Sequence, residues 1–169
     1  YDYLNIMAYD CNAYWSETSG FHEPLYNPTP NWPNYGSATA SLNIHNKSAT
    51  WVTRGLDKSK SSLGLALYGW AWNPCTGATR PGQNFTFCNN AAGYYNYFDA
   101  TAQLAAGRGT RFYDSLAHQP WISNPGGNPS YVNYQDPQSL GAKMDYLKAQ
   151  RWGGLMLFAN EHAADLSMG

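Results

Sequence analysis

The sequence has little charge of either sign. Only 12% of its 169 residues are Asp, Glu, Lys or Arg, and the formal net charge is −1. Such a chain offers no broad basic surface for nucleic acid or for an anionic membrane. It has no apolar run of about 20 residues, the length of a membrane-spanning helix, and no apolar signal segment. It begins within a strand-like segment without Met, so we expect a piece of a longer protein.

Cysteine is scarce and its count is odd, at three. Cys75 and Cys88 bracket a loop rich in Gly, Pro and Asn, and we expect them to form a local disulfide. Cys11 follows an apolar strand-like segment, where a free, buried thiol is one option, and the sequence does not decide its state. Asn46 and Asn84 begin N-glycosylation sequons. Together, the cysteine pair and the sequons favour a secreted glycoprotein.

Aromatic residues are abundant, at 16% of the chain. They fit a large aromatic core, a sugar-binding surface, or a mixture of the two, which we favour because each Tyr and Trp needs a partner for its polar tip. A long Pro-rich loop from Cys11 to Gly36 contains several of these aromatic residues. They either line a sugar-binding cleft or pack the loop onto the rest of the fold: Trp15, Tyr26, Trp32 and Tyr35. His22 is expected to make structural hydrogen bonds, and the sequence predicts no metal site and no cofactor.

Hydrophobic periodicity predicts alternating strands and helices. We expect strands over 1–10 (buried on both faces), 62–72 and 155–159. Helices are expected over 37–55, with a stripe that includes Ile44, Trp51 and Val52, over 94–104, and from Pro137 after the N-cap Asp136. A last helix begins near 161. Residues 73–93 are expected to be a loop, and 111–134 to hold three short antiparallel strands. The alternation predicts an α/β fold with right-handed crossovers and a parallel sheet.

Four segments resemble the glycoside hydrolase family 18 chitinases. Tyr1–Asp10, Y-D-Y-L-N-I-M-A-Y-D, is similar to their sixth barrel strand, [FY]-D-[FY]-[LIV]-N-[LIV]-M-[TA]-Y-D. Trp15–Tyr26 resembles W-x-x-x-T-G-x-H-S-P-L-Y, and Ser62–Trp72 resembles the seventh strand, L-x-L-G-x-P-x-Y-G-R-x-[FW]. Tyr134–Phe158 is similar to the last helix–strand pair. The resemblance covers almost the whole chain in the family's order.

The resemblance implies a partial (β/α)8 barrel, with strands six to eight and an α+β insertion between the last two. Residues 1–73 would hold strands six and seven, 74–134 the insertion, and 135–169 the last helix–strand unit. A complete barrel takes ~250 residues. The remaining N-terminal part of the barrel is therefore an expected partner.

The resemblance also implies hydrolysis of β-1,4-linked N-acetylglucosamine polymers such as chitin, by substrate-assisted retention. The family's acid closes the motif D-x-x-D-x-D-x-E, which this sequence lacks. We therefore expect this chain alone to be inactive. By the same resemblance Tyr9 would donate a hydrogen bond to the substrate acetamide, Asp10 would accept hydrogen bonds or orient its neighbours, and Met7 would floor the pocket.

The remaining expected sugar contacts are Trp15, Tyr68, Trp70 and Phe158. Two of them depart from the family pattern: Trp70 replaces the arginine of Y-G-R, and Phe158 replaces a tryptophan. An acidic pair after the last strand is also replaced, by Ala163 and Ala164. These departures leave two alternatives open, a non-catalytic chitin- or glycan-binding lectin and a structural extracellular glycoprotein of the same fold.

Overall fold

The computed structural model describes residues 2–13, 15–16, 18–33, 41–74, 79–83 and 87–159, with no side chains described at 73–74 and 87–92. The expected Cys75–Cys88 disulfide, the Asn84 sequon and the last helix lie outside the described residues, and so do Tyr35, Ala163 and Ala164. No helix in the described ranges is both long and apolar enough to cross a membrane.

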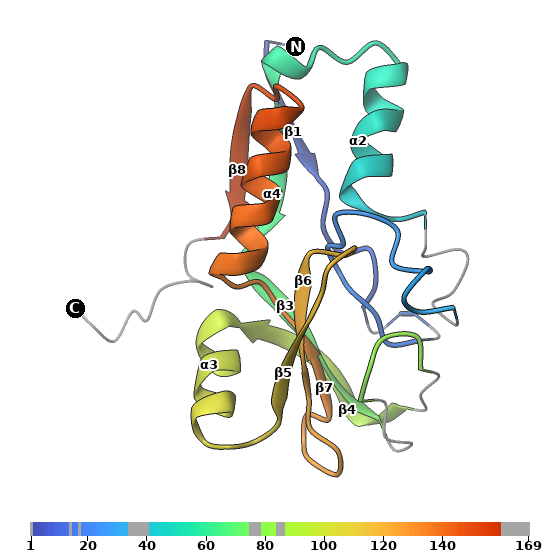
Figure 1. The fold of residues 1–169 in the computed structure, drawn as a ribbon, viewed down its shortest axis with the longest axis vertical. Helices are drawn as coiled ribbons and strands as arrows, with labels where there is room; N and C mark the ends of the chain where they lie inside the picture. Colours follow the sequence, from blue (N-terminus) through green and yellow to red (C-terminus); the bar gives the residue numbers. More distant parts are fainter. Residues whose placement is uncertain are drawn as a thin grey trace, which may run out of the picture.

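A parallel sheet of three strands forms one half of the molecule, in the order β1-β2-β8. Its strands are β1 (Leu4–Met7), β2 (Ser61–Ala66) and β8 (Gly154–Phe158). The helix α2 (Ile44–Thr53) and a short 3-10 turn (Lys58–Lys60) join β1 to β2, and α4 (Pro137–Ala149) leads into β8 (Figure 1). The parallel α/β prediction is therefore confirmed, although these three strands do not close a barrel.

A five-stranded antiparallel sheet forms the other half, in the order β4-β3-β7-β6-β5. Its elements, with one helix, are β3 (Tyr68–Pro74), β4 (Phe87–Asn96), α3 (Tyr97–Ala105), β5 (Thr110–Asp114), β6 (Gln119–Ser123) and β7 (Tyr131–Asn133). The antiparallel pairing of β5, β6 and β7 confirms the three short strands predicted within 111–134.

The strand predicted over 62–72 is two strands in two different sheets. β2 is buried along its whole length. The chain bends at Leu67, whose N–H donates to the Phe158 carbonyl oxygen at 2.8 Å, and β3 then pairs with β4 and β7. Gly69 permits this crossing, because a Cβ there would lie 1.9 Å from the Asn133 carbonyl oxygen. A continuous apolar run cannot reveal such a change of sheet.

The helix predicted over 94–104 begins at Tyr97, and residues 94–96 are instead the end of β4. The rest of β4 lies within 73–93, where we expected a loop. The Asp99 carboxylate accepts the Asn96 N–H at 3.0 Å, as one half of a capping box, and this fixes the helix start. The capping residues therefore set the start of α3, and the aromatic periodicity used for the prediction did not locate it.

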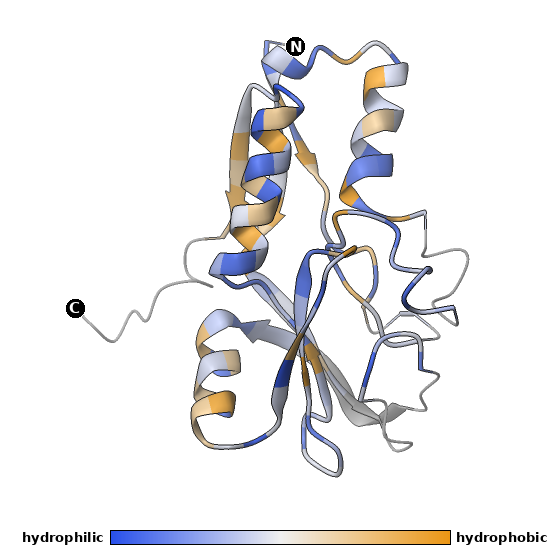
Figure 2. Cartoon of the chain, viewed as in Figure 1, coloured by the Kyte–Doolittle hydropathy of each residue, from blue (hydrophilic) through white to orange (hydrophobic). Residues whose placement is uncertain are grey.

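The helix predicted from Ser37 begins at Ile44, because the Asn43 side chain caps it by accepting the Asn46 N–H at 2.8 Å. Its apolar stripe is only partly buried: Ile44 is 1% exposed, whereas Trp51 is 45% exposed and Val52 37%. β1 was predicted to be buried on both faces, but Met7 is 68% exposed. Met7 and Trp51 line one groove between β1 and α2, whereas Val52 lines a separate hollow with Tyr146 and Trp152. Hydrophobic residues of β1 and β8 are visible in Figure 2.

The helix α4 starts as predicted, with Asp136 as its N-cap and Pro137 at its first position. A lysine of this helix, Lys143, is fully buried, whereas Met144 is 40% exposed. Two clusters of buried residues flank this region. One packs β1 and β2 against α2 and α4, and the other is aromatic and joins the end of β1 to β3, β6 and β7.

Candidate active site

The candidate site is built around Asp10, just beyond the C-terminal end of β1. The Tyr68 hydroxyl donates to Asp10 Oδ1 at 2.7 Å, and the Trp70 Nε1–H donates to the same oxygen at 3.0 Å. Both donors reach it because residues two apart on β3 face the same side of the strand. His22 Nδ1 lies 3.9 Å from that oxygen, too far for a hydrogen bond.

Asp10 is held in its ionised form. Burial would raise the pKa of its carboxyl group, but the nearby His22 ring and the hydrogen bonds from Trp70 and Tyr68 outweigh burial and lower that pKa below its ordinary value. Burial and the adjacent carboxylate raise the pKa of Tyr68 well above its usual range. The proton therefore stays on the Tyr68 phenol, and the carboxylate, with a side chain 34% exposed, presents its charge to the outside.

Tyr9 supplies a buried hydroxyl without a hydrogen-bond partner in the described part of the chain. Its ring stacks on Phe158 with centroids 5.7 Å apart and meets Tyr68 edge-on at 6.0 Å. Burial, then the negative charge of Asp10, raises the pKa of Tyr9, so the hydroxyl remains protonated. An unpaired buried hydroxyl costs about 1–3 kcal/mol, so this group is suited to meet an acceptor that the chain itself does not supply.

Three exposed rings surround this centre. Trp15 is 53% exposed, Tyr94 61% and Phe158 45%, whereas Trp70 is only 5% exposed. Tyr94 stacks on Trp70 with centroids 4.7 Å apart, and Trp15 meets Trp70 edge-on at 5.7 Å. Trp70 therefore lies beneath the outer rings. Sequence reasoning missed Tyr94 as a site residue, because β4, whose pairing with β3 places Tyr94 opposite Trp70, was not predicted.

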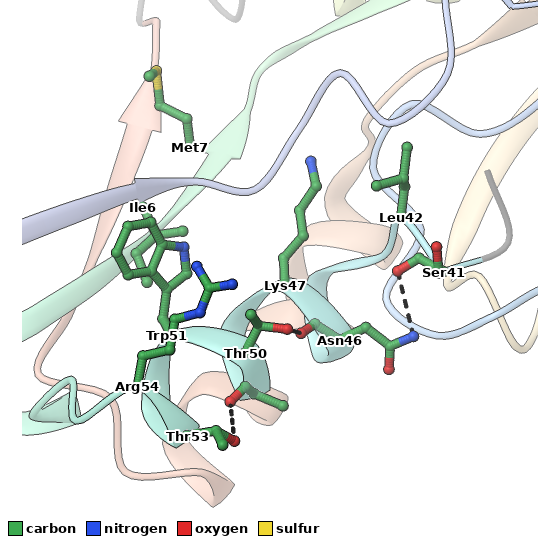
Figure 3. Close-up of a pocket in the computed structure, with 11 residues that line it drawn as sticks. Ile6, Met7, Ser41, Leu42, Asn46, Lys47, Thr50, Trp51, Thr53 and Arg54 are labelled. Atoms are coloured by element: carbon green, nitrogen blue, oxygen red, sulfur yellow. Dashed lines mark hydrogen bonds between the residues drawn. The ribbon is translucent and has the colours of Figure 1, made fainter. Parts of the chain in front are cut away.

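The expected site residues Tyr9, Asp10, Trp15, Tyr68, Trp70 and Phe158 are thus brought together. Met7 lines a groove of about 820 Å³ beside α2, with Ile6 and Leu42 among its other lining residues. Figure 3 shows Lys47 and Trp51 reaching from α2 toward β1 across this groove. Lys47 Nζ also donates to the Tyr9 carbonyl oxygen at 3.0 Å, which ties α2 to the strand end that carries the site.

A buried ion pair, which was not predicted from the sequence, holds the long loop that contributes to the site. Lys143 Nζ lies 3.2 Å from Glu23 Oε2, and both side chains are almost completely buried. Glu23 also accepts the Ala66 N–H at 3.1 Å and a hydrogen bond from the Gln135 amide. Burial lowers the pKa of Lys143, and Glu23 opposes that shift. The pair fixes the long loop against the end of β2 and against α4.

The other loop residues take structural positions. The Trp32 indole donates to Asp114 at 2.8 Å and its ring packs on Trp121, so it supports the loop. Tyr26 packs among His45, His118 and Tyr146. His22 makes structural hydrogen bonds through its main chain, with Asn133 and Cys11, while neither ring nitrogen has a partner in the described ranges. No group of three or more His, Cys, Asp or Glu residues there suits a metal ion.

The sequence and this geometry can be compared with known proteins. The family model described as Glycosyl hydrolases family 18 matches residues 1–162, and the chain belongs to that family. Chitinase A1 of Niallia circulans is 29% identical in an alignment 165 residues long that covers 93% of this chain and 23% of that protein.

Solved structures show the same fold. The Ostrinia furnacalis Group IV chitinase in complex with allosamidin aligns with a TM-score of 0.81 and 21% identity, over 95% of this chain and 44% of that one. Human YKL-39, described as a pseudo-chitinase with retained chitooligosaccharide binding properties, aligns with a TM-score of 0.79 and 19% identity, over 94% and 43% of the two chains. The chain therefore spans less than half the length of these relatives.

Proposed function

We propose that this chain forms part of a chitinase-like glycoside hydrolase. It would act on β-1,4-linked N-acetylglucosamine polymers by substrate-assisted retention, with the catalytic acid outside these 169 residues. The observation that carries the proposal is the buried, unpaired Tyr9 hydroxyl beside the ionised Asp10. A neutral donor and a fixed negative charge suit a reaction in which a carbonyl oxygen attacks a carbon that becomes cationic.

In this reaction the acetamide oxygen bonds to the anomeric carbon while the glycosidic bond breaks. The leaving oxygen takes a proton from the acid, and water then opens the oxazoline ring. Tyr9 would donate to the acetamide oxygen and hold it in line, while Asp10 stabilises positive charge on the ring. Phe158 and Trp15 would stack on sugars, and Met7 would floor the pocket. Tyr68 and Trp70 would mainly hold Asp10.

The partner that completes the barrel would be the remaining N-terminal part, and the three parallel strands would be barrel strands six to eight. The exposed Met7 and Trp51 and the groove beside α2 support this, because they leave apolar surface uncovered.

We also infer secretion. Asn46 is exposed on α2 but lines the same groove, so a glycan there would compete with a covering barrel segment. Peptide mass spectrometry of the natural protein would show whether Asn46 is glycosylated.

A non-catalytic glycan-binding lectin is the second candidate, and a structural glycoprotein of the same fold is the third. The lectin is favoured by Trp70, which carries no charge where the family pattern has arginine, and by exposed rings that suffice for binding. The fold does not decide between them, because a chitinase and a protein described as a pseudo-chitinase both share it.

The test uses the intact natural protein with a fluorogenic chitooligosaccharide. We expect turnover, and we expect Tyr9→Phe to lower kcat by about 100-fold while chitooligosaccharide binding persists. Phe112→Ala is the matched control, since Phe112 is an exposed ring on β5, at the far edge of the antiparallel sheet. Binding without turnover would establish the lectin, and the absence of both would leave the structural role. Turnover by the 169-residue chain alone would contradict the placement of the acid outside it.

A further inference from the structure

The partners of the Asp10 carboxylate are uncharged donors, which affects what the site can bind. Tyr68 and Trp70 supply both hydrogen bonds to Oδ1. Within the described ranges, no Lys or Arg side chain lies within 4.0 Å of the carboxylate, and the remaining neighbour is His22 Nδ1 at 3.9 Å. Glu23, the next residue in the chain, is neutralised by Lys143 and faces the core. The charge of Asp10 is thus not balanced by a lysine or arginine of this part of the structure.

Tyr94 belongs to the same assembly. Its ring stacks on Trp70 at 4.7 Å and meets Tyr68 edge-on at 5.0 Å, so it packs on both side chains that hold Asp10. With 61% of its surface exposed it forms the outermost face of the cluster, beside Trp15. Aromatic faces stack on pyranose rings, and their electron-rich centres attract cations.

We propose that the face formed by Asp10, Tyr94 and Trp15 selects a β-1,4-linked glycan with free 2-amino groups, that is, partly deacetylated chitin. This inference rests on the function proposed above and names its substrate class. The reacting sugar keeps the acetamide that Tyr9 would bind, and a glucosamine unit occupies the neighbouring position. Its ammonium group would pair with Asp10 across an aromatic surface that attracts cations. In the family pattern an arginine stands at Trp70, and its positive charge would repel that ammonium group.

The probes are chitotetraose and the four tetramers that each carry one glucosamine at a defined position. Their affinities are measured by calorimetry for the intact natural protein carrying Tyr9→Phe, in which binding should persist while turnover is slow, and each sugar is checked by mass spectrometry to be intact afterwards. We expect at least one glucosamine tetramer to bind about tenfold more tightly than chitotetraose, from one partly exposed ion pair and one cation–π contact. Added salt should reduce this preference, because it screens the ion pair.

Variants assign the preference to its residues. Asp10→Asn should abolish it, and Trp70→Arg should do the same by placing a guanidinium beside the carboxylate. Tyr94→Ala should weaken the binding of all five tetramers. Asp145→Asn is the matched charge control, because Asp145 is 82% exposed on α4 and makes only a 3.9 Å ion pair with Lys148. It should leave the preference unchanged.

Each outcome decides something. If chitotetraose binds as tightly as every glucosamine tetramer, the inference is wrong while the proposed function stands. If the preference survives in Asp10→Asn, another group causes it and the inference is also wrong. If the protein binds none of the five sugars, the proposed glycan site itself fails. Asp10→Asn removes only a charge, so the test holds even if Trp70→Arg does not fold.

Discussion

The two sheets of this molecule differ in how completely they bury their own residues. In the antiparallel sheet, Trp72, Tyr131 and Ile122 are fully buried. In the parallel sheet, Met7 on β1 is 68% exposed, and on β8 Leu157 is 43% and Leu155 36% exposed. Both sheets are made largely of apolar strands, so composition does not separate them.

The difference follows from what covers each sheet. The antiparallel strands fold back on one another, and loop residues such as Phe21 and Trp32 pack onto Trp121. α2 and α4 cover one face of the parallel sheet (Figure 1), where Leu63 and Leu65 of β2 are in the core. Leu155 and Leu157 lie on this same face but on the edge strand β8, whereas Met7 lies on the opposite face. A parallel sheet normally has both faces covered. The antiparallel sheet therefore has its central strands covered by this chain, whereas the parallel sheet needs further structure, and the following experiments test that contrast.

The largest effect should come from a lysine placed in each sheet of the 169-residue chain. Ile122→Lys buries a charge at a fully buried position, and we expect it to lower the free energy of unfolding by about 5 kcal/mol or to prevent folding. Leu157→Lys adds a charge to an exposed position and should change that free energy by less than about 0.5 kcal/mol. Denaturant titration measures both.

Self-association provides a second test of the difference between the two sheets. An uncovered apolar sheet should make the 169-residue chain associate, and Leu157→Lys should reduce this association in sedimentation experiments. Equal destabilisation by the two lysines would show that β8 is covered in solution. A monomeric parent chain with a sharp melting transition would contradict the inference that further structure belongs on this side.

The second largest effect should come from the Glu23–Lys143 pair, which links the two units. Lys143→Met leaves the Glu23 carboxylate buried without its cation, and we expect a loss of about 3–5 kcal/mol in the free energy of unfolding. The double variant Glu23→Gln with Lys143→Met removes both charges and should recover most of that loss. A double variant no more stable than Lys143→Met would mean that the packing of the lysine chain, rather than the unpaired charge, explains the effect.

A smaller effect is expected where the antiparallel unit holds the long loop. The buried Asp114 accepts hydrogen bonds from the side chains of Asn31 and Trp32, both at 2.8 Å, and from the N–H groups of Leu116 and Ala117. Asp114→Asn keeps the shape but replaces one acceptor oxygen by a donor. We expect a loss of about 2 kcal/mol and increased proteolysis within residues 24–33. Asp145→Asn, at the exposed α4 site, should change neither quantity.

Much of this arrangement could be predicted from the sequence, because local signals fix it. Asp136 and Pro137 marked the start of α4, and the M-A-Y-D ending of β1 placed Tyr9 and Asp10 at a strand end. The break at Leu67 could not be predicted, since it depends on Gly69 meeting Asn133 from a distant strand. A pattern of apolar residues records burial and carries no information on which sheet a strand joins.

The expected site residues lie together, but the hydrogen bonds among them could not be predicted. Trp70, an expected sugar contact, also donates to Asp10 and lies beneath Tyr94. Lys143 was not singled out, because its partner Glu23 is 120 residues away along the chain. Long-range pairs of this kind have no local signal, and the exposure of Trp51 likewise depends on which surface lies opposite it.

The smallest effect concerns Cys11, at the junction of the two units, where its N–H donates to the His22 carbonyl oxygen at 2.7 Å. It is a free, buried thiol. Burial raises the pKa of the thiol from 9.0 to about 11. Because the folded state holds this proton more tightly, its contribution to stability is complete below pH 9.0 and is lost as the pH rises through about 11.

We therefore expect the free energy of unfolding to fall by about 1 kcal/mol more in the parent chain than in Cys11→Ala between pH 8 and about pH 10. The comparison with Cys11→Ala cancels the buried tyrosines, whose pKa values are also raised and whose titration lowers stability in the same direction. Labelling with a thiol reagent at pH 8 should be slow and should speed up only with denaturant. Rapid labelling of the folded chain, or equal pH dependence in the two proteins, would mean that the junction between the sheets opens in solution.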